Sequence, residues 1–137
     1  ALKEEGIPPC QDYIKVFAPG RGEAEKCVRE LLGLDDPPTA VLTMNGWITL
    51  EVLTVLKELR VRIPEEMSVL GFDDPDWARL VEPPLTAVSQ PARQLGKVAA
   101  ELLFEKLFGD RDRSEQRFIE METTFIERSS CERYPSS

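Results

Sequence analysis

The sequence predicts an α/β fold in which a parallel sheet is flanked by helices. Short apolar runs rich in β-branched residues predict strands, and segments with apolar residues three and four positions apart predict helices. The two kinds of segment alternate along the chain. Strands joined by helices form right-handed crossovers, which bring the strands side by side in one direction.

The order of elements follows from these periodicities and from the Pro and Gly residues between them. Residues 74–80 are expected as a loop or a single helical turn, and residues 109–116 as a charged loop. The expected strands are 12–18, 39–44, 67–72, 85–88 and 118–126, and the expected helices are 23–32, 48–59 and 92–108. The tail after residue 128 is expected to fray.

Charge and composition narrow the possible functions. The 137 residues include 17 Lys and Arg against 25 Asp and Glu, for a formal net charge of −8. DNA binding depends on clustered basic side chains, so this segment is not expected to hold nucleic acid by itself. Its apolar runs are far shorter than the roughly 18 residues that span a bilayer. No membrane segment is expected.

The residues with catalytic or metal-binding chemistry are few. The chain has no histidine, and Cys10, Cys27 and Cys131 are widely spaced. The absence of histidine removes the commonest general base and zinc ligand. The wide spacing of the three cysteines favours reduced thiols, as in a cytoplasmic protein. Asp73 and Asp74 are adjacent and project differently, which disfavours a catalytic pair. We expect no enzyme activity, cofactor or metal.

In a parallel sheet, ligands bind beyond the carboxyl ends of the strands. This rule directs attention to residues 19–22, 45–47, 73–74 and 89–90, because each group follows a predicted strand. Asp73 can accept two hydrogen bonds from neighbouring hydroxyls, or it can cap the turn before Pro75. Asn45 can bind a hydroxyl, cap the following helix, or do both.

Four motifs follow one another along the chain: IPEEMSVLGFDD, EPPLTAVSQP, QLGKVAAELL and FIERSS. In this order and spacing, they resemble the LacI family of transcriptional regulators. The G-F-D-D motif alone would be weak, but its interval from P-P-L-T-x-V-x-Q-P is specific. The resemblance covers nearly the whole chain, and the chain's start within a helix suggests a fragment.

The resemblance implies one subdomain of a type I periplasmic-binding-protein-like fold, plus a crossover helix of a subdomain that is absent here. Residues 1–90 would form the C-terminal subdomain, 91–117 the crossover helix and loop, 118–128 the returning strand, and 129–137 the tail. Operator DNA would be bound only through an absent N-terminal helix-turn-helix. The helix 92–108 would then expose its apolar stripe, which we expect to be buried by a second chain or by the rest of the protein; the stripe comprises Leu95, Val98, Ala99, Leu102, Leu103 and Leu107.

The resemblance also implies roles for individual residues. Asp73, Asn45 and Gln90 would contact a small effector, expected to be a sugar or a sugar derivative, and Gln90 can alternatively act at the hinge. Arg21 would suit an acidic or phosphorylated effector, or it is a surface residue. Trp77 would lie at the interface of a homodimer or higher oligomer, since tryptophan is enriched at interfaces.

The sequence departs from the family pattern at the helix after residue 45. Gly46 stands where the family has Asp, Thr49 where it has Ala, and Glu51 where it has Gly. The polar network and the close packing of this helix are therefore expected to differ. A periplasmic sugar-binding protein of a transport system is the alternative function, and the P-P-L-T-x-V-x-Q-P and Arg-Ser motifs favour the regulator.

Overall fold

The computed structural model describes residues 4–18, 21–108 and 117–133. The predicted loop 109–116 lies outside these residues. The helices are η1 (Gln11–Tyr13), α1 (Arg21–Leu32), α2 (Gly46–Glu58), η2 (Asp76–Arg79) and α3 (Ala92–Phe108), and the strands are β1 (Ala40–Thr43), β2 (Ser68–Phe72), β3 (Thr86–Ser89) and β4 (Thr124–Ile126).

The strands form one sheet in the order β1-β2-β3-β4. β1, β2 and β3 are parallel, with Val41 opposite Val69 and Gly71 opposite Ala87. β4 returns antiparallel to β3, with Ile126 opposite Ala87. The predicted α/β class with parallel strands is confirmed, and the returning strand makes the sheet mixed.

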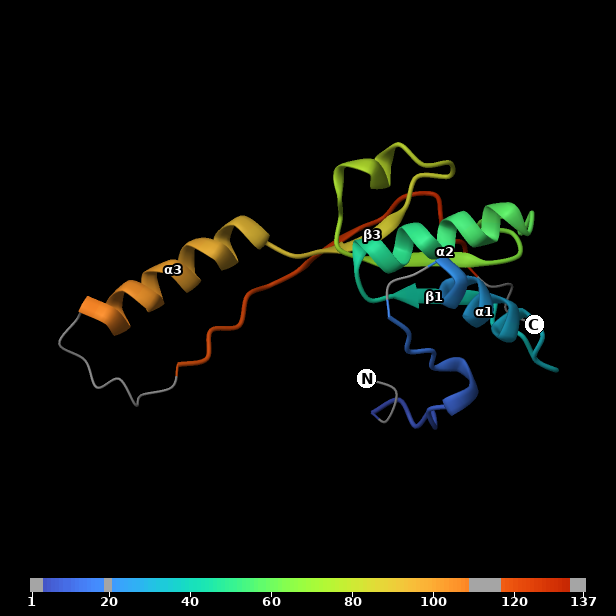
Figure 1. The fold of residues 1–137 in the computed structure, drawn as a ribbon, viewed down its shortest axis with the longest axis horizontal. Helices are drawn as coiled ribbons and strands as arrows, with labels where there is room; N and C mark the ends of the chain where they lie inside the picture. Colours follow the sequence, from blue (N-terminus) through green and yellow to red (C-terminus); the bar gives the residue numbers. More distant parts are fainter. Residues whose placement is uncertain (1–3, 19–20, 109–116, 134–137) are drawn as a thin grey trace.

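The core lies where α1 and α2 pack against each other and against the first strands of the sheet (Figure 1). α2 begins after its N-cap Asn45 and presents Val52, Val55 and Leu56 to this core. β2 is buried along most of its length, as expected for a strand inside a parallel sheet. The core therefore holds the ends of β1 and β2 in place.

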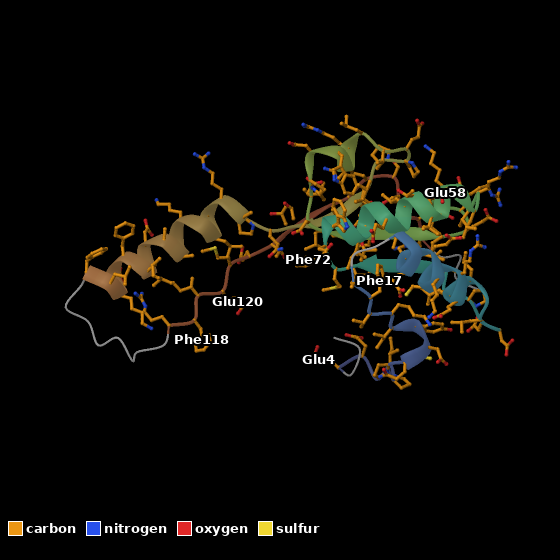
Figure 2. All side chains as sticks on the ribbon, in the orientation of Figure 1. Glu4, Phe17, Glu58, Phe72, Phe118 and Glu120 are labelled. Atoms are coloured by element: carbon orange, nitrogen blue, oxygen red, sulfur yellow. The ribbon has the colours of Figure 1, made fainter. Side chains whose placement is uncertain are left out.

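α3 lies apart from this main body, to which two chain segments connect it (Figure 1). Its bounds match the predicted helix, yet none of its 17 residues is buried. Leu103, Phe104 and Leu107 are all at least half exposed, and Arg117 forms an ion pair with Glu105 at 3.0 Å. The side chains of α3 lie away from the main body (Figure 2). The apolar stripe is thus present, and Leu95, Ala99, Leu103 and Leu107 are exposed while Val98 and Leu102 are half-buried.

The predicted strand at 12–18 does not form. Its first residues belong to η1, and residues 14–18 lie outside the sheet. Phe17 packs against the core, and the Tyr13 hydroxyl donates to the backbone oxygen of Asp36 at 2.9 Å. These side-chain contacts hold the segment beside the main body without a ladder of backbone hydrogen bonds. The run of β-branched and aromatic residues predicted a strand, which is wrong: only Lys15 and Phe17 of residues 14–18 are half-buried, and the segment pairs with no strand.

The C-terminal region also differs from prediction. Only Thr124–Ile126 of the expected strand 118–126 pairs with β3. Residues 129–132, expected to fray, are bonded to the sheet: the Val69 N–H donates to the Ser130 oxygen at 2.8 Å, and the Glu132 N–H donates to the Ser68 hydroxyl at 3.2 Å. This segment is held partly by hydrogen bonds of serine hydroxyls, which the periodicity of apolar residues does not predict.

Truncation of the core tests this packing. Leu56 is 1% exposed, so we expect Leu56→Ala to lower the free energy of unfolding by about 2–5 kcal/mol. The measurement is chemical denaturation followed by circular dichroism. Lys57→Ala, on the exposed side of the same helix, serves as the control and should change it by less than about 0.5 kcal/mol. Equal losses in the two variants would contradict the described core.

Candidate functional site

The carboxyl ends of the three parallel strands lie at one edge of the sheet. The register places Thr43 opposite Gly71, and Phe72 opposite Val88, so β1, β2 and β3 end at similar heights. Asn45, Asp73 and Gln90 follow these ends. Three of the side chains predicted from sequence therefore leave the same edge, as the strand order requires.

Asp73 and Gln90 are in direct contact. The Gln90 Nε2 donates to Asp73 Oδ1 at 2.7 Å. The backbone N–H of Asp73 donates to the Val88 oxygen at 2.9 Å, which ties the end of β2 to β3. Asp73 has φ of 82°, a left-handed conformation that Asp tolerates better than most residues. The turn thus directs a half-buried carboxylate toward the residue that follows β3.

Asn45 caps α2, as one of the two predicted roles requires. Its Oδ1 accepts the N–H of Ile48 at 2.8 Å. Thr49, one of the departures from the family pattern, donates its hydroxyl to the Asn45 backbone oxygen at 2.7 Å and lies 2.7 Å from the Thr43 hydroxyl. This buried pair of hydroxyls holds the start of α2 to the end of β1. Glu51, another departure, has a buried Oε2 without a hydrogen-bond partner in the described part of the chain.

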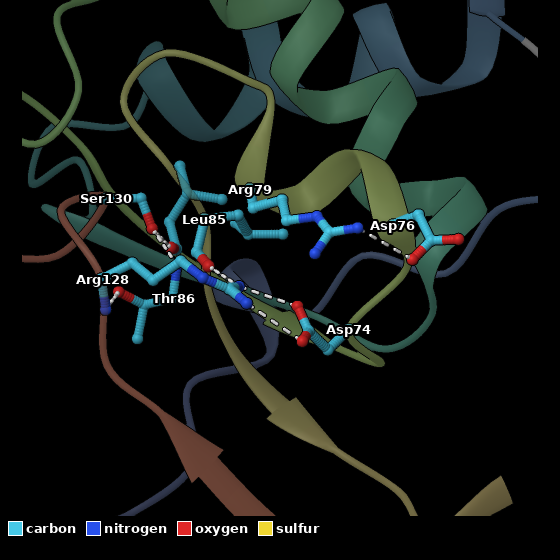
Figure 3. Close-up of polar contacts among 8 residues, drawn as sticks. Asp74, Asp76, Arg79, Leu85, Thr86, Arg128 and Ser130 are labelled. Carbon is cyan, nitrogen blue, oxygen red and sulfur yellow. Dashed lines mark hydrogen bonds and ion pairs between the residues drawn. The ribbon is translucent and has the colours of Figure 1, made fainter.

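Arg128 forms a two-oxygen ion pair beside the site (Figure 3). Its Nη1 and Nη2 donate to the two carboxylate oxygens of Asp74 at 2.7 and 3.0 Å, and Nη1 also donates to the Leu85 oxygen at 2.6 Å. Both side chains of the ion pair are only 19% exposed. The guanidinium lowers the pKa of the Asp74 carboxyl below its usual range. The Arg-Ser ending stood out in the sequence as a motif, but no local pattern revealed this role.

Ser130 anchors the same segment two residues further on. It is fully buried, accepts the Thr86 N–H at 2.7 Å and donates to the Val69 oxygen at 2.6 Å (Figure 3). The Arg128 N–H donates to the Thr86 hydroxyl at 3.0 Å. One short segment is therefore bonded to both β2 and β3, close to the turn that carries Asp73 and Asp74.

The other two predicted site residues lie elsewhere. Arg21 begins α1, and its side chain lies outside the described residues. Trp77 belongs to η2 and packs partly against the core. A Cβ at Gly46 would lie 3.4 Å from Pro75 Cγ and 3.9 Å from Trp77 Cζ2, so the start of α2 is close to this loop. Trp47, in contrast, is 62% exposed.

An apolar cavity of about 240 Å³ lies between β1, α1, α2 and residues 13–17. None of Asn45, Asp73 and Gln90 lines it. Its walls offer few hydrogen-bond partners for hydroxyl groups, so it does not suit a polar metabolite. The cavity lies beside the segment predicted as a strand, and the polar side chains Asn45, Asp73 and Gln90 lie at the carboxyl edge of the sheet instead.

The described residues hold neither a metal-binding cluster nor a membrane-spanning helix. Among them, no three His, Cys, Asp or Glu side chains are grouped so that they could hold a metal ion. The described helices include none with the length and apolar character needed to cross a membrane.

Comparisons with known proteins agree with the fold. The family described as a periplasmic binding protein-like domain matches residues 1–131. The HTH-type transcriptional repressor PurR of Vibrio cholerae is 34% identical over an alignment that covers 88% of this chain and 41% of the repressor. A transcriptional regulator LacI from Bacillus cereus has a TM-score of 0.85 at 30% identity, with 96% of this chain and 46% of that chain covered.

A third relative is a complex with a sugar. The complex of the transcriptional regulator CelR with cellobiose has a TM-score of 0.81 at 29% identity, and the match covers 94% of this chain and 39% of that one. The present chain thus spans less than half the length of each of these relatives.

Parallel strands with polar side chains at their carboxyl edge, and the matches to regulators, define an effector-binding domain of the periplasmic-binding-protein type. The chain belongs to the periplasmic binding protein-like domain family, and within it to the LacI-type transcriptional regulators.

The ion pair of Asp74 and Arg128 predicts a specific dependence of stability on pH. The folded state lowers the Asp74 pKa, so its stabilisation is complete above the usual carboxyl pKa of about 4 and is lost as pH falls through the lowered value. Asp74→Asn should reduce the free energy of unfolding by about 1–3 kcal/mol at pH 7. Below about pH 4, the free energies of unfolding of Asp74→Asn and the wild type should become more similar.

Urea denaturation from pH 2 to pH 8 measures this difference. Asp76→Asn is the control, because Asp76 is fully exposed and pairs with Arg79 at 3.5 Å. It should leave the free energy of unfolding nearly unchanged, since solvent screens an exposed pair. If Asp74→Asn and the wild type differ in free energy of unfolding by the same amount at every pH, the role of this half-buried ion pair is contradicted.

Proposed function

We propose that this chain forms the carboxy-terminal part of the effector-binding core of a LacI-type regulator, and that its effector is a small sugar-like molecule. The observation that carries the proposal is the contact of Asp73 with Gln90 at the carboxyl edge of the sheet. The cellobiose complex of a related regulator supports a sugar as the class of effector.

The chemistry of the edge suits a polyol. The carboxylate of Asp73 is half-buried and can accept hydrogen bonds from two neighbouring hydroxyls, while the exposed Gln90 amide can donate to a third. Capping of α2 uses the side-chain oxygen of Asn45, and its amide nitrogen can donate to the ligand. Arg21 stays in the proposed set, since a guanidinium would bind an acidic or phosphorylated effector.

The proposed mechanism needs a second lobe. α3 and the returning segment connect to the main body through residues 89–92 and 118–124, and the uncovered apolar face of α3 supports its packing on a second subdomain. An effector held between two lobes would favour one relative orientation of them. In the complete regulator, this change would alter how paired DNA-binding heads sit on an operator.

A homodimer is part of the proposal. Trp47 and Leu50 on α2 and Leu80 after η2 are large apolar side chains with exposed fractions of 62%, 38% and 78%. The approach of Gly46 to Pro75 and Trp77 brings these two elements together, which supports one shared apolar surface. A second copy of the chain is the proposed partner of this surface, with Trp77 at its inner edge.

The matches to transcriptional repressors support a regulator over a transport protein. A cytoplasmic regulator binds its effector without altering it, so no turnover of the sugar is proposed.

Thermal stability tests the proposed ligand class. The full-length protein should show a raised Tm with at least one member of a panel of mono- and disaccharides, cellobiose among them, and of sugar phosphates. Saturation at 100 times Kd adds about 2.7 kcal/mol to the stability. Chromatography of the recovered sugar should find it unchanged. No shift with any member of the panel would overturn the proposal.

Substitutions separate the roles of the edge residues. Asp73→Asn should remove most of the thermal shift, because it removes the charged acceptor. Asn45→Ser keeps a good N-cap while removing the amide, so it should weaken the shift with little loss of unliganded stability. Asp76→Asn, in the same loop, is the matched control and should leave the shift intact. An unchanged shift in Asp73→Asn would refute the assignment of this carboxylate.

The proposed dimer is tested by sedimentation velocity. Trp47→Glu combined with Leu80→Glu should convert the dimer to monomer, since two charges would be buried at the interface. Val16→Glu, at an exposed apolar residue outside the proposed surface, is the control and should sediment as the wild type does. A dimer that survives the double substitution would argue against this interface.

A further inference from the structure

We propose that Arg128 is a positioning residue for effector binding, which acts through Asp74 on the direction of the Asp73 carboxylate. The inference rests on the proposed function, because it assumes that Asp73 binds the effector. It assigns to a residue of the returning C-terminal segment a role in a site that this segment does not itself line.

The conformation of Asp73 is the first reason. Its φ of 82° is uncommon for a residue with a side chain, so the surrounding structure must hold it. On one side it is held by the Asp73 N–H, which donates to Val88, and by Gln90, which donates to the carboxylate. Both contacts come from β3 and the residues directly after it.

The second reason is the contact that fixes Asp74, on the other side of the turn after β2. Arg128 binds both oxygens of Asp74, the next residue along the chain, and also the Leu85 oxygen. The guanidinium is a rigid planar fork, so a two-oxygen contact specifies the orientation of the carboxylate as well as its distance. Asp74 cannot rotate without breaking this contact, and the peptide that joins it to Asp73 is constrained with it.

The third reason is the rigidity of Arg128 itself. Its backbone N–H is bonded to the Thr86 hydroxyl, and Ser130 is bonded to both Val69 and Thr86. The close-up shows the guanidinium reaching from this anchored segment to Asp74, while Arg79 pairs separately with Asp76 (Figure 3). The Arg128–Asp74 pair is therefore held by a segment that is bonded to the sheet, whereas the neighbouring Arg79–Asp76 pair is exposed.

The same geometry links the turn to both connections with α3. Gln90 begins the outgoing segment and Arg128 ends the returning one. The two residues hold adjacent carboxylates, those of Asp73 and Asp74. A movement of either connecting segment would therefore shift the Asp73 carboxylate, which is the group proposed to bind the effector.

The experiment uses the full-length protein and isothermal titration calorimetry with the sugar of the panel that gives the largest thermal shift. Arg128→Lys keeps the charge and loses the fork, and it should weaken binding about tenfold, or 1.4 kcal/mol. Asp74→Asn should weaken it to a similar extent. The double variant should be no weaker than either single one, because both substitutions break one contact.

Two controls separate positioning from general stability. Leu56→Ala truncates a buried core side chain that takes no part in the ion pair of Asp74 and Arg128, so it should lower Tm while Kd stays within a factor of about two. Arg79→Lys alters the exposed ion pair with Asp76 and should change neither Tm nor Kd. Crystal structures of Arg128→Lys and Asp74→Asn should show the Asp73–Gln90 contact broken or the carboxylate redirected.

The outcomes distinguish this inference from the proposed function. If Asp73→Asn binds the sugar as the wild type does, both are overturned. If Asp73→Asn fails to bind but Arg128→Lys retains wild-type affinity, only the positioning role is overturned. The positioning role is also overturned if Leu56→Ala weakens binding as much as Arg128→Lys does, because the effect would then come from stability. If Arg128→Lys does not fold, Asp74→Asn is compared with Leu56→Ala in the same way.

Discussion

Hydrogen bonds from Arg128 and Ser130 tie the C-terminal segment across β2 and β3, and much of the structure depends on them. Ser130 is buried, and its hydroxyl both accepts from Thr86 and donates to Val69 in a low-dielectric setting where an unmade bond would be costly. Arg128 adds a two-oxygen ion pair at the edge of the same sheet. The segment closes the mixed sheet and supports the turn after β2.

The carboxyl edge of the sheet is where the polar chemistry gathers. Parallel pairing brings the ends of β1, β2 and β3 together, and Asp73 meets Gln90 there. The apolar cavity lies elsewhere, beside β1. A site made of an open polar edge, rather than an enclosed pocket, is consistent with a domain that binds its ligand together with a second lobe.

α3 also exposes a face that would be covered by a partner. A helix without buried residues gains little from tertiary packing, which supplies most helical stability in proteins. Its apolar stripe was predicted from spacing, and its exposure is the physical reason to expect a covering partner. In the proposed function, this partner is a second subdomain.

The class of fold, most element bounds and the residues at the strand ends were predictable from the amino-acid sequence, because periodicity and turn residues are local signals. The family resemblance came from motif spacing. Three features became visible only in the folded chain: residues 14–18 lie outside the sheet, residues 129–132 are bonded to it, and Arg128 binds Asp74. These features depend on contacts between residues as many as 64 positions apart, which no local pattern encodes.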